Sequence, residues 1–450
     1  MPDLFKVAKF GGTSMADATA MRRCASIVKG DPDKKIIVVS ATSGTTNLLT
    51  EFIVSNGKEQ KVEIAQQIRT KHLQICEEIK NQAEVVQKIT PILDELKEIA
   101  STNRIMTPML RDEVLSFGER LSSEIFTAIL IEETGEDVIC FDVRKVIKTD
   151  QNYGSAEPNV DQIAKEYEAH LLAVTENSRV VTQGFIGSDD NGNTTTLGRG
   201  GSDYSAALLA EAADADVLEI WTDVTAIYTT DPRIVKTAKP ITEISFDEAA
   251  ELSVFGAKVL HPATMVPAIR KNIRVYVGSS IYPEKPGTWI VKETKSKPAI
   301  SAISLRRNQT LLTVHSLDML HRYGFLSKLF QVLSDHKISV DLVTTSEVSV
   351  ALTLDSDIHT PGKQKLTDEV MNDLRSFCEV NIERNLALIA VVGNNLEATA
   401  GLSGPVFGSL IDVNIRLICH GASSHNLCFL VSESEAEGVV NILHNKFIDG

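Results

Sequence analysis

The first part of the chain alternates short apolar runs with longer amphipathic stretches. The runs "LFKVAKF" (4–10) and "KIIVVSA" (35–41) have the length and apolar content of strands buried in a parallel sheet. Helical spacing separates such runs, first in "MADATAMRRCASIV" and then over a long region from about 48 to 101. Strands that alternate with helices predict a mostly parallel sheet covered on both faces. Later strands are predicted in "DVICFDV", "RVVTQGFIG", "VLEIWTD" and "RVYVGSS".

Small polar residues follow the first two predicted strands directly. "GGTS" comes after the first strand, which ends near Lys9, and "TSGTTN" comes after the second. In parallel sheets, ligands bind beyond the carboxyl ends of the strands, and a helix N-terminus attracts phosphate. The two loops therefore favour an anion site, although each loop alone could be a structural turn.

A third loop, "GRGGSD", has the residues to hold a small anion. The "DDNG" stretch before it predicts a hairpin whose return strand is "TTTL". The glycine turn then leads into the helical stretch "YSAALLAEAA". One guanidinium and one carboxylate, Arg199 and Asp203, lie in this turn.

The pattern changes near residue 295, where "KETKSKPAIS" is typical of a linker. Beyond it, one order of strand, helix and two strands occurs twice, and Gly324 and Gly401 match at an offset of 77 residues. We therefore predict two small α+β modules in tandem, with sheets joined edge to edge to cover their edge strands. A duplicated structural domain and a pair of sensors that share an interface both fit this pattern.

Composition excludes several classes of partner. The 450 residues carry a net charge of −15 without a Lys/Arg cluster, which argues against nucleic acid and anionic membranes as partners. The N-terminus lacks the apolar run of a signal peptide, and no apolar segment has the length of a membrane span, so a cytoplasmic location is expected. The 6 cysteines form no CxxC pair, which favours free thiols over a zinc or redox site.

Several catalytic motifs are absent from the sequence. It has no GxxxxGK[ST], GxSxG or HExxH, and "GRGGSD" has an aspartate where the dinucleotide fingerprint needs its third glycine. The histidines lack metal-ligand spacing, so no metal site in the protein is predicted, and His261 is interpreted as a core or turn residue. Glu119 follows a Phe-Gly pair in a helical pattern, where a solvated role and a site role are equally open.

The order and spacing of these stretches resemble the aspartokinase family over essentially the whole chain. The tandem modules resemble ACT domains, and "HSLDMLHRYGFLSKLFQVL" with "SVDLVTTSEVS" resembles its monofunctional, lysine-sensitive class. The other matching stretches are "KFGGTSMAD", "FGERLSSEI", "FDVRKV", "TQGFIGSDDNGNTTTLGRGGSDYSAALLAEA", "WTDVTAIYTTDPR", "FGAKVLHPAT" and "SEVSVALTLD".

The resemblance implies an amino-acid kinase domain over 1–295 and ACT-like modules over 305–383 and 384–450. It also implies transfer of the ATP γ-phosphoryl group, with Mg²⁺, to the side-chain carboxylate of L-aspartate. The product would be 4-phospho-L-aspartate, the first step toward lysine, threonine and methionine. Feedback inhibition by L-lysine is implied as well, in a homodimer or dimer of dimers assembled through the ACT-like modules.

Roles follow for the residues that match the family motifs. Lys9 would stabilise the transferring phosphoryl group and Asp203 would orient Lys9 or the reacting groups, while Arg199 would bind the aspartate α-carboxylate and Glu119 its α-ammonium. The other substrate contacts would be Ser40, Gly44, Thr46, Gly200, Gly201 and Ser202. The nucleotide would be bound by Gly11, Gly12, Thr222, Asp223, Tyr228, Arg233, Lys258 and Val259.

The ACT-like half matches a lysine pocket, with one departure. Arg322 and Tyr323 stand where the family more often has a small residue before a basic one, which puts effector affinity and identity in question. Two other functions stay open: another amino-acid or carbamate kinase, and a non-catalytic amino-acid sensor. The lysine pocket would comprise Met319, His321, Gly324, Phe325, Leu326, Val340, Asp341, Ser346 and Glu347.

Overall fold

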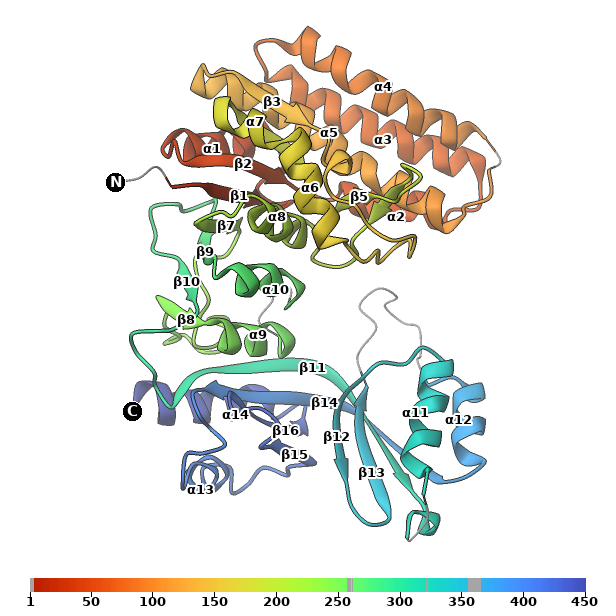
Figure 1. Cartoon of the computed structure of the whole chain (residues 1–450). Helices are drawn as coiled ribbons and strands as arrows, with labels where there is room; N and C mark the ends of the chain where they lie inside the picture. The colour runs from red at the N-terminus through yellow and green to blue at the C-terminus, as the bar shows by residue number, and fades with distance from the viewer. Residues whose placement is uncertain (1–3, 103, 257–259, 261, 321–322, 355–365) are drawn as a thin grey trace. The chain divides into compact units, whose positions relative to one another are not determined.

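The computed structural model describes residues 4–102, 104–256, 260, 262–320, 323–354 and 366–450 (Figure 1). Residue contacts divide the chain into two units. Unit 1 comprises residues 1–227, 240–246 and 258–294, and unit 2 comprises residues 228–239, 247–257 and 295–450.

Unit 1 is built on an eight-stranded, mostly parallel sheet, as the alternating pattern predicted. The first strand lies in the middle of the sheet, between β2 and β7. Among the described strand pairs of this sheet, only the pairing of β9 with β10 is antiparallel. In sheet order the strands are β3 (Val138–Phe141), β4 (Arg179–Gln183), β2 (Lys34–Val39), β1 (Lys6–Phe10), β7 (Val217–Thr222), β9 (Arg274–Ser279), β10 (Thr288–Val291) and β8 (Glu243–Ser245).

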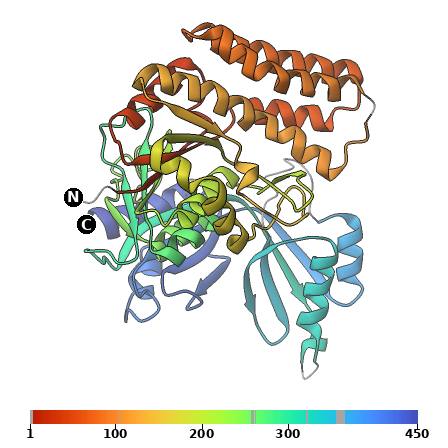
Figure 2. The same ribbon diagram turned by 45° about the horizontal axis from the view of Figure 1, so that its top comes forward.

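Helices cover both faces of this sheet (Figures 1 and 2). Ala8 and Phe10 of β1 join one core with residues of α1 and α5. Because side chains alternate along a strand, Lys9 points to the opposite face, where it contacts α8. The described helices of unit 1 are α1 (Ala18–Lys29), α2 (Thr45–Val54), α3 (Lys58–Glu77), α4 (Gln82–Ser101), α5 (Pro108–Thr134), α6 (Val160–His170), α7 (Leu172–Asn177), α8 (Gly201–Ala212) and α10 (Pro262–Lys271), with a short 3₁₀ turn at Val143–Lys145.

The long helical region expected from about 48 to 101 is helical as predicted, and it is divided into three helices. Ser55 is extended, with φ −67° and ψ 134°, and Gly57 precedes α3. Pro91, in contrast, lies inside α4 without ending it. The apolar positions of all three helices face one core, so their periodicity alone did not show the breaks.

The predicted hairpin is confirmed. Strands β5 (Ile186–Ser188) and β6 (Thr194–Thr196) pair antiparallel across the "DDNG" turn. The chain then turns through Gly198 and Gly200, and α8 begins at Gly201. The turn that carries Arg199 is therefore fixed at both ends by regular structure.

Unit 2 contains a six-stranded antiparallel sheet that joins the two repeats edge to edge, as predicted from the 77-residue offset. The long strands β11 and β14 pair in the middle of the sheet. In sheet order the strands are β12 (Val340–Thr345), β13 (Ser349–Leu354), β11 (Ile300–His315), β14 (Glu379–Gly393), β16 (Asn426–Ser432) and β15 (Leu417–His420). The described helical segments are η2 (Leu317–Met319), α11 (Phe325–Asp335), α12 (Asp368–Arg375), α13 (Ser403–Gly408), α14 (Ala436–His444) and η3 (Asn445–Asp449).

Two early segments of the chain pack into unit 2 rather than unit 1. In segment 228–239, Val235 belongs to the core of the second repeat, and Thr229 Oγ1 lies 2.9 Å from His444 Nε2. In helix α9 (Phe246–Val254), Glu251 accepts a 2.6 Å hydrogen bond from Asn426 Nδ2. The boundary between the units is therefore crossed several times along the sequence.

Candidate active site

An ion pair joins the first strand of the sheet to α8. Lys9 Nζ lies 2.5 Å from Asp203 Oδ1, and the two side chains are 10% and 15% exposed. Asp203 is in the first turn of α8, where the helix dipole favours a carboxylate. Gly200, with φ 71°, precedes that helix in a left-handed conformation that suits glycine. A cation and an anion are thus held together, with little access to water, at the carboxyl end of β1.

The glycines after β1 let three segments of the chain approach one another. Gly11 N donates to Trp221 O at 3.1 Å, and a Cβ added to Gly11 would lie 3.5 Å from Lys9 Nζ. A Cβ added to Gly12 would lie 3.3 Å from Ala41 O. Backbone N–H groups near a buried ammonium are the groups that phosphate oxygens bind.

The loop at 40–46 joins β2 to α2 beside these glycines. Ser40 N donates to Phe10 O at 3.1 Å, which continues the pairing of β2 with β1. Gly44, with φ 79°, caps the N-terminus of α2. Thr46 is exposed, whereas Thr45 is buried. The loop therefore has one exposed side and one side packed against the protein.

Glu119, on α5, carries a buried carboxyl group with one free oxygen. The residue is 4% exposed, and the backbone N–H groups of Ala41 and of Glu119 itself favour the ionised form of its carboxyl. Glu119 Oε2 has no hydrogen-bond partner among the described residues. Burial raises the pKa of this carboxyl to about 8. An unpaired buried oxygen of this kind suits an ammonium group of a ligand.

Arg199 lies in the turn between β6 and α8, between two glycines with positive φ, Gly198 at 74° and Gly200 at 71°. Its side chain is exposed, and it forms no ion pair within the described part of the chain. Gly201 and Ser202 follow it at the start of α8. A guanidinium in this setting is available for a carboxylate from solution.

Asp112 is a site-supporting residue that the sequence analysis missed. It lies on α5, seven positions before Glu119, and is 1% exposed. Its Oδ2 accepts hydrogen bonds from Gly154 N at 2.9 Å and Thr196 N at 2.7 Å, while burial raises its pKa. These bonds fix the hairpin strand that precedes Arg199. The sequence did offer one signal: Asp112 and Glu119 are seven residues apart, which places them on the same face of a helix.

The proposed nucleotide contacts are divided between the units. Thr222 ends β7, and its carbonyl accepts a 2.8 Å hydrogen bond from Ser280 N, while Asp223 beside it is exposed. Tyr228 and Arg233 belong to unit 2, where Arg233 is 88% exposed and its Nη2 lies 2.6 Å from Asp231 Oδ2. Lys258, Val259 and His261 lie outside the described residues.

Comparison with known proteins places this arrangement in a family. The sequence model of the Amino acid kinase family matches residues 5–279, and that of the ACT domain matches residues 389–447. The chain is 48% identical to "Lysine-sensitive aspartokinase 3" of Escherichia coli (strain K12) over 445 residues, which cover 98% of this chain and 99% of that protein. The chain belongs to the aspartokinase family. The predicted fold class and the predicted activity, aspartate kinase, are thereby confirmed.

Two solved structures of Escherichia coli aspartokinase III resemble this aspartokinase over its whole length. The structure in complex with aspartate and ADP has a TM-score of 0.89 and covers 99% of this chain and 100% of that chain. The structure in complex with lysine and aspartate has a TM-score of 0.85 and covers 99% of each chain. Both are 48% identical to this aspartokinase.

The residues expected to bind lysine lie in the first repeat of unit 2. Met319, Phe325 and Val340 pack against one hydrophobic core, to which Leu312 and Val350 also belong. Gly324 caps α11 with φ 90°, and the exposed Leu326 follows in the first turn of that helix. Ser346 and Glu347 are exposed in the turn between β12 and β13.

Asp341, another expected lysine contact, already has a cationic partner in this aspartokinase. Its Oδ2 lies 3.1 Å from Arg306 Nη1, and the two side chains are 16% and 15% exposed. Tyr323, half of the departure from the family pattern, is fully exposed. His321 and Arg322 lie outside the described residues.

Proposed function

We propose that this aspartate kinase transfers the γ-phosphoryl group of ATP to the side-chain carboxylate of L-aspartate and yields 4-phospho-L-aspartate. The observation that carries the proposal is the ion pair of Lys9 with Asp203 beside two glycine loops. A buried carboxyl oxygen of Glu119 without a hydrogen-bond partner among the described residues supports an amino acid as the acceptor.

Electrostatics and positioning would supply most of the catalysis. A carboxylate is already a nucleophile, so the reaction needs no strong general base, and the barrier lies in bringing anions together. Lys9 would neutralise charge on the phosphoryl group in transfer, and Asp203 would hold the ammonium of Lys9 in place. Arg199 would bind the α-carboxylate and Glu119 the α-ammonium of aspartate, which leaves the side-chain carboxylate to react.

The remaining proposed contacts would frame the two substrates. Ser40, Gly44 and Thr46 on one loop and Gly200, Gly201 and Ser202 on the other would line the aspartate. Gly11, Gly12, Thr222, Asp223, Tyr228, Arg233, Lys258 and Val259 would bind ATP.

Magnesium would enter with the nucleotide. The described residues hold no group of three His, Cys, Asp or Glu side chains that could bind a metal ion. The ion would be held mainly by phosphate oxygens and water. When bound, Mg²⁺ supplies positive charge that offsets the charge of the phosphates. Lys9 would add the protein's own cation at the same place.

L-Lysine would inhibit the enzyme from the ACT region. The Escherichia coli relative is named lysine-sensitive, and one of its structures contains lysine and aspartate. Asp341 and Glu347 provide the anionic groups that a ligand with two ammonium groups needs. Inhibition requires that lysine bind one arrangement of the ACT region better than another.

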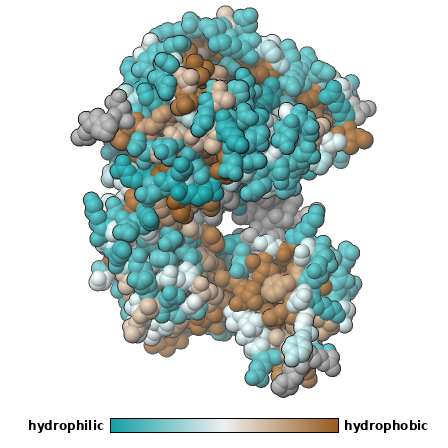
Figure 3. Space-filling view, viewed as in Figure 1, coloured by the Kyte–Doolittle hydropathy of each residue, from teal (hydrophilic) through white to brown (hydrophobic). Residues whose placement is uncertain are grey.

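A homodimer, or a dimer of dimers, would assemble through the ACT region in the cytoplasm. Figure 3 shows a hydrophobic area over β12 and β13, and Val343 of β12 is 39% exposed. Exposed apolar area of this kind favours association with another chain. No described helix has the length and hydropathy needed to cross a membrane.

A coupled assay of ADP release tests the proposed function. We expect activity with L-aspartate and ATP–Mg, none with L-glutamate or carbamate, and inhibition by L-lysine but not by L-threonine or L-methionine. Activity only with glutamate would assign another amino-acid kinase. A protein that binds lysine without any kinase activity would be a sensor, and inhibition by threonine alone would remove lysine as the effector.

A further inference from the structure

Two buried threonines support the loop at 40–46 from its inner side. Thr42 is 1% exposed and Thr45 is 0% exposed, and their Oγ1 atoms lie 2.6 Å apart. Ser43 and Thr46 are exposed. Thr46, which is proposed to contact the substrate, therefore points outward, while the neighbouring Thr42 and Thr45 point inward and hold the loop.

Thr42 is hydrogen-bonded to His72 of α3, a fully buried histidine that the proposed mechanism does not use. His72 Nδ1 lies 2.7 Å from Ile68 O, a carbonyl that can only accept, so Nδ1 carries the proton. His72 Nε2 is then an acceptor, and Thr42 Oγ1 donates to it at 3.1 Å. Burial lowers the pKa of His72 to about 4, which keeps the ring neutral at physiological pH.

Lys71 completes the chain of hydrogen bonds from the other end. Because the Thr42 proton is directed to His72, Thr45 must donate to Thr42. Lys71 Nζ in turn donates to Thr45 Oγ1 at 3.3 Å and to Ser43 O. All the bonds run in one direction, from Lys71 through the two threonines to His72, an order in which neighbouring bonds strengthen one another.

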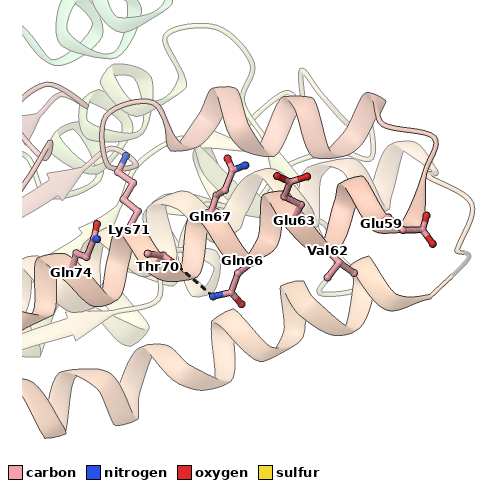
Figure 4. Close-up of a pocket in the computed structure, with 8 residues that line it drawn as sticks. All are labelled: Glu59, Val62, Glu63, Gln66, Gln67, Thr70, Lys71 and Gln74. Atoms are coloured by element: carbon pink, nitrogen blue, oxygen red, sulfur yellow. Dashed lines mark hydrogen bonds between the residues drawn. The ribbon is translucent and has the colours of Figure 1, made fainter.

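Lys71 also lies at the edge of an open groove along α3. The groove has a volume of about 600 Å³, and Figure 4 shows Lys71 extending to the opposite side of the helix from Gln66. Lys71 therefore lines this groove and also reaches the loop, through its bonds to Ser43 O and Thr45 Oγ1.

Helix α5 holds the same loop from another side. A Cβ added to Gly118 would lie 2.7 Å from Ala41 Cβ, so this glycine permits a close approach of the helix to the loop. The backbone N–H of Ala41 favours the ionised form of the next residue, Glu119. A displacement of the loop would therefore also move a donor away from the carboxyl group proposed to bind the substrate ammonium.

We propose that His72 and Lys71 are positioning residues for phosphoryl transfer, which fix the 40–46 loop through Thr42 and Thr45. The inference rests on the proposed function, because Ser40, Thr46 and Glu119 receive their roles from it. It assigns a role in the reaction to α3, a helix that supplies none of the proposed substrate contacts.

Substitutions that keep volume and remove hydrogen bonds test the inference. In His72→Phe and Thr42→Val we expect KM for aspartate to rise about tenfold, the factor for one lost buried hydrogen bond, with a fall in kcat and an ATP KM within about twofold of the parent. His72→Gln can accept from Thr42 and donate to Ile68 O, so it should restore most of the parent KM. Thr42→Ser keeps the hydroxyl that Thr42→Val removes, so its KM for aspartate should also be near the parent value.

A readout independent of turnover is hydrogen exchange of peptides that cover residues 40–46. Exchange should accelerate in His72→Phe and Thr42→Val and not in Gln67→Ala, a matched control on an exposed position of α3. The double variant His72→Phe/Thr42→Val should show the same KM for aspartate and the same exchange rate as His72→Phe alone, because both substitutions remove one hydrogen bond. If His72→Phe fails to fold, the Thr42→Val and Thr42→Ser pair gives the same comparison.

The outcomes separate this inference from the proposed function. A parent enzyme without activity on aspartate overturns the function, while the exchange data still decide whether His72 fixes the loop. A parent enzyme with activity, and variants with unchanged KM and unchanged exchange, overturn the positioning role. A lower Tm in His72→Phe with parent-like kinetics assigns the residue to stability alone.

Discussion

Two carboxylates in this aspartokinase are each proposed to receive an ammonium group, and their surroundings differ. Glu119 of the kinase unit is buried, has a raised pKa, and has one oxygen without a partner among the described residues. Asp341 of the ACT region is ion-paired with Arg306 at 3.1 Å. Glu119 can accept a ligand without losing a cation, whereas Asp341 has to share or exchange one.

The difference corresponds to the tasks proposed for the two sites, substrate binding for Glu119 and effector binding for Asp341. A catalytic site gains from charges that are in place before the substrate arrives, because no reorganisation is then needed in the transition state. An allosteric site gains from a competing internal partner, because the ligand then changes the contacts of the protein when it binds. In the proposed mechanism, the Lys9–Asp203 pair would extend this preassembled arrangement to the phosphoryl group.

The largest expected effect concerns Lys9, the preassembled cation. Lys9→Ala should lower kcat by about 10²- to 10³-fold, since the lysine charge matters most in the transition state. Steady-state kinetics gives kcat, and calorimetry should show aspartate binding near the parent value. The double variant Lys9→Met/Asp203→Asn controls for a buried unpaired carboxylate and should be folded but inactive. Near-normal kcat in Lys9→Ala would remove Lys9 from the chemistry.

Arg199 is exposed and forms no ion pair with the residues that the structure describes, so it tests whether an exposed cation also contributes. Arg199→Lys keeps the charge but loses the planar fork that binds a carboxylate with two hydrogen bonds. We expect a loss of about 1.5–3 kcal/mol in aspartate binding, the range for hydrogen bonds to charged groups. Kinetics should show this in the KM for aspartate, with the KM for ATP nearly unchanged. An unchanged KM for aspartate would exclude Arg199 from the substrate site.

Asp341 tests the carboxylate that already has a cationic partner, Arg306. Asp341→Ala should abolish lysine inhibition and leave uninhibited activity near the parent value, because the residue lies in unit 2 on β12. Typical coupling between two sites would let lysine change aspartate affinity by about 5- to 150-fold in the parent, and lysine should not change it in Asp341→Ala. Titration of the kinase activity with lysine measures this effect, and Asp335→Ala, at an exposed position, is the matched control. Full lysine sensitivity in Asp341→Ala would place the effector elsewhere.

The smallest effect concerns the proton on Glu119. Its pKa of about 8 in the folded enzyme exceeds the ordinary value of 4.5, so between these values the folded state holds a proton that the unfolded state has released. This contribution to stability is fully present below pH 4.5 and is lost as the pH rises through 8. An ammonium ligand favours the ionised carboxylate, so aspartate binding should release up to one proton below pH 8.

Calorimetry in buffers of different ionisation enthalpy measures this release. It should approach one proton near pH 6.5, disappear above pH 9, and be absent in Glu119→Gln. Aspartate affinity should fall up to tenfold per pH unit below 8. A parent enzyme that releases no proton at pH 6.5 would mean that Glu119 does not face the substrate ammonium.

Local patterns predicted the positions around Arg199 well. The "DDNG" turn, the short strand after it and the glycine turn into α8 each depend on residues close in sequence, and all three are present. The position of Lys9 near the end of the first strand was also predictable. In a parallel sheet the loops that follow the strands meet at one edge, so Lys9 was expected to lie beside them.

Contacts between distant residues could not be predicted in this way. Asp112 holds Thr196 across 84 positions, and His72 holds Thr42 across 30, so neither bond leaves a periodic signal. The pairing of Arg306 with Asp341 depends on how β11 and β12 are placed within one sheet. Hydrophobic periodicity reports which face of an element is buried, not which polar groups meet there.

Segment 228–239 belongs to unit 2, although its sequence lies within the part of the chain that matches the kinase family. A chimera that exchanges the regulatory region between relatives is usually designed with a single junction in the sequence. Here a splice near residue 295 would leave Val235 and Thr229 without the core and the histidine they pack against. A functional chimera would have to carry at least three pieces of chain together, and evolution faces the same restriction when it recombines the two halves.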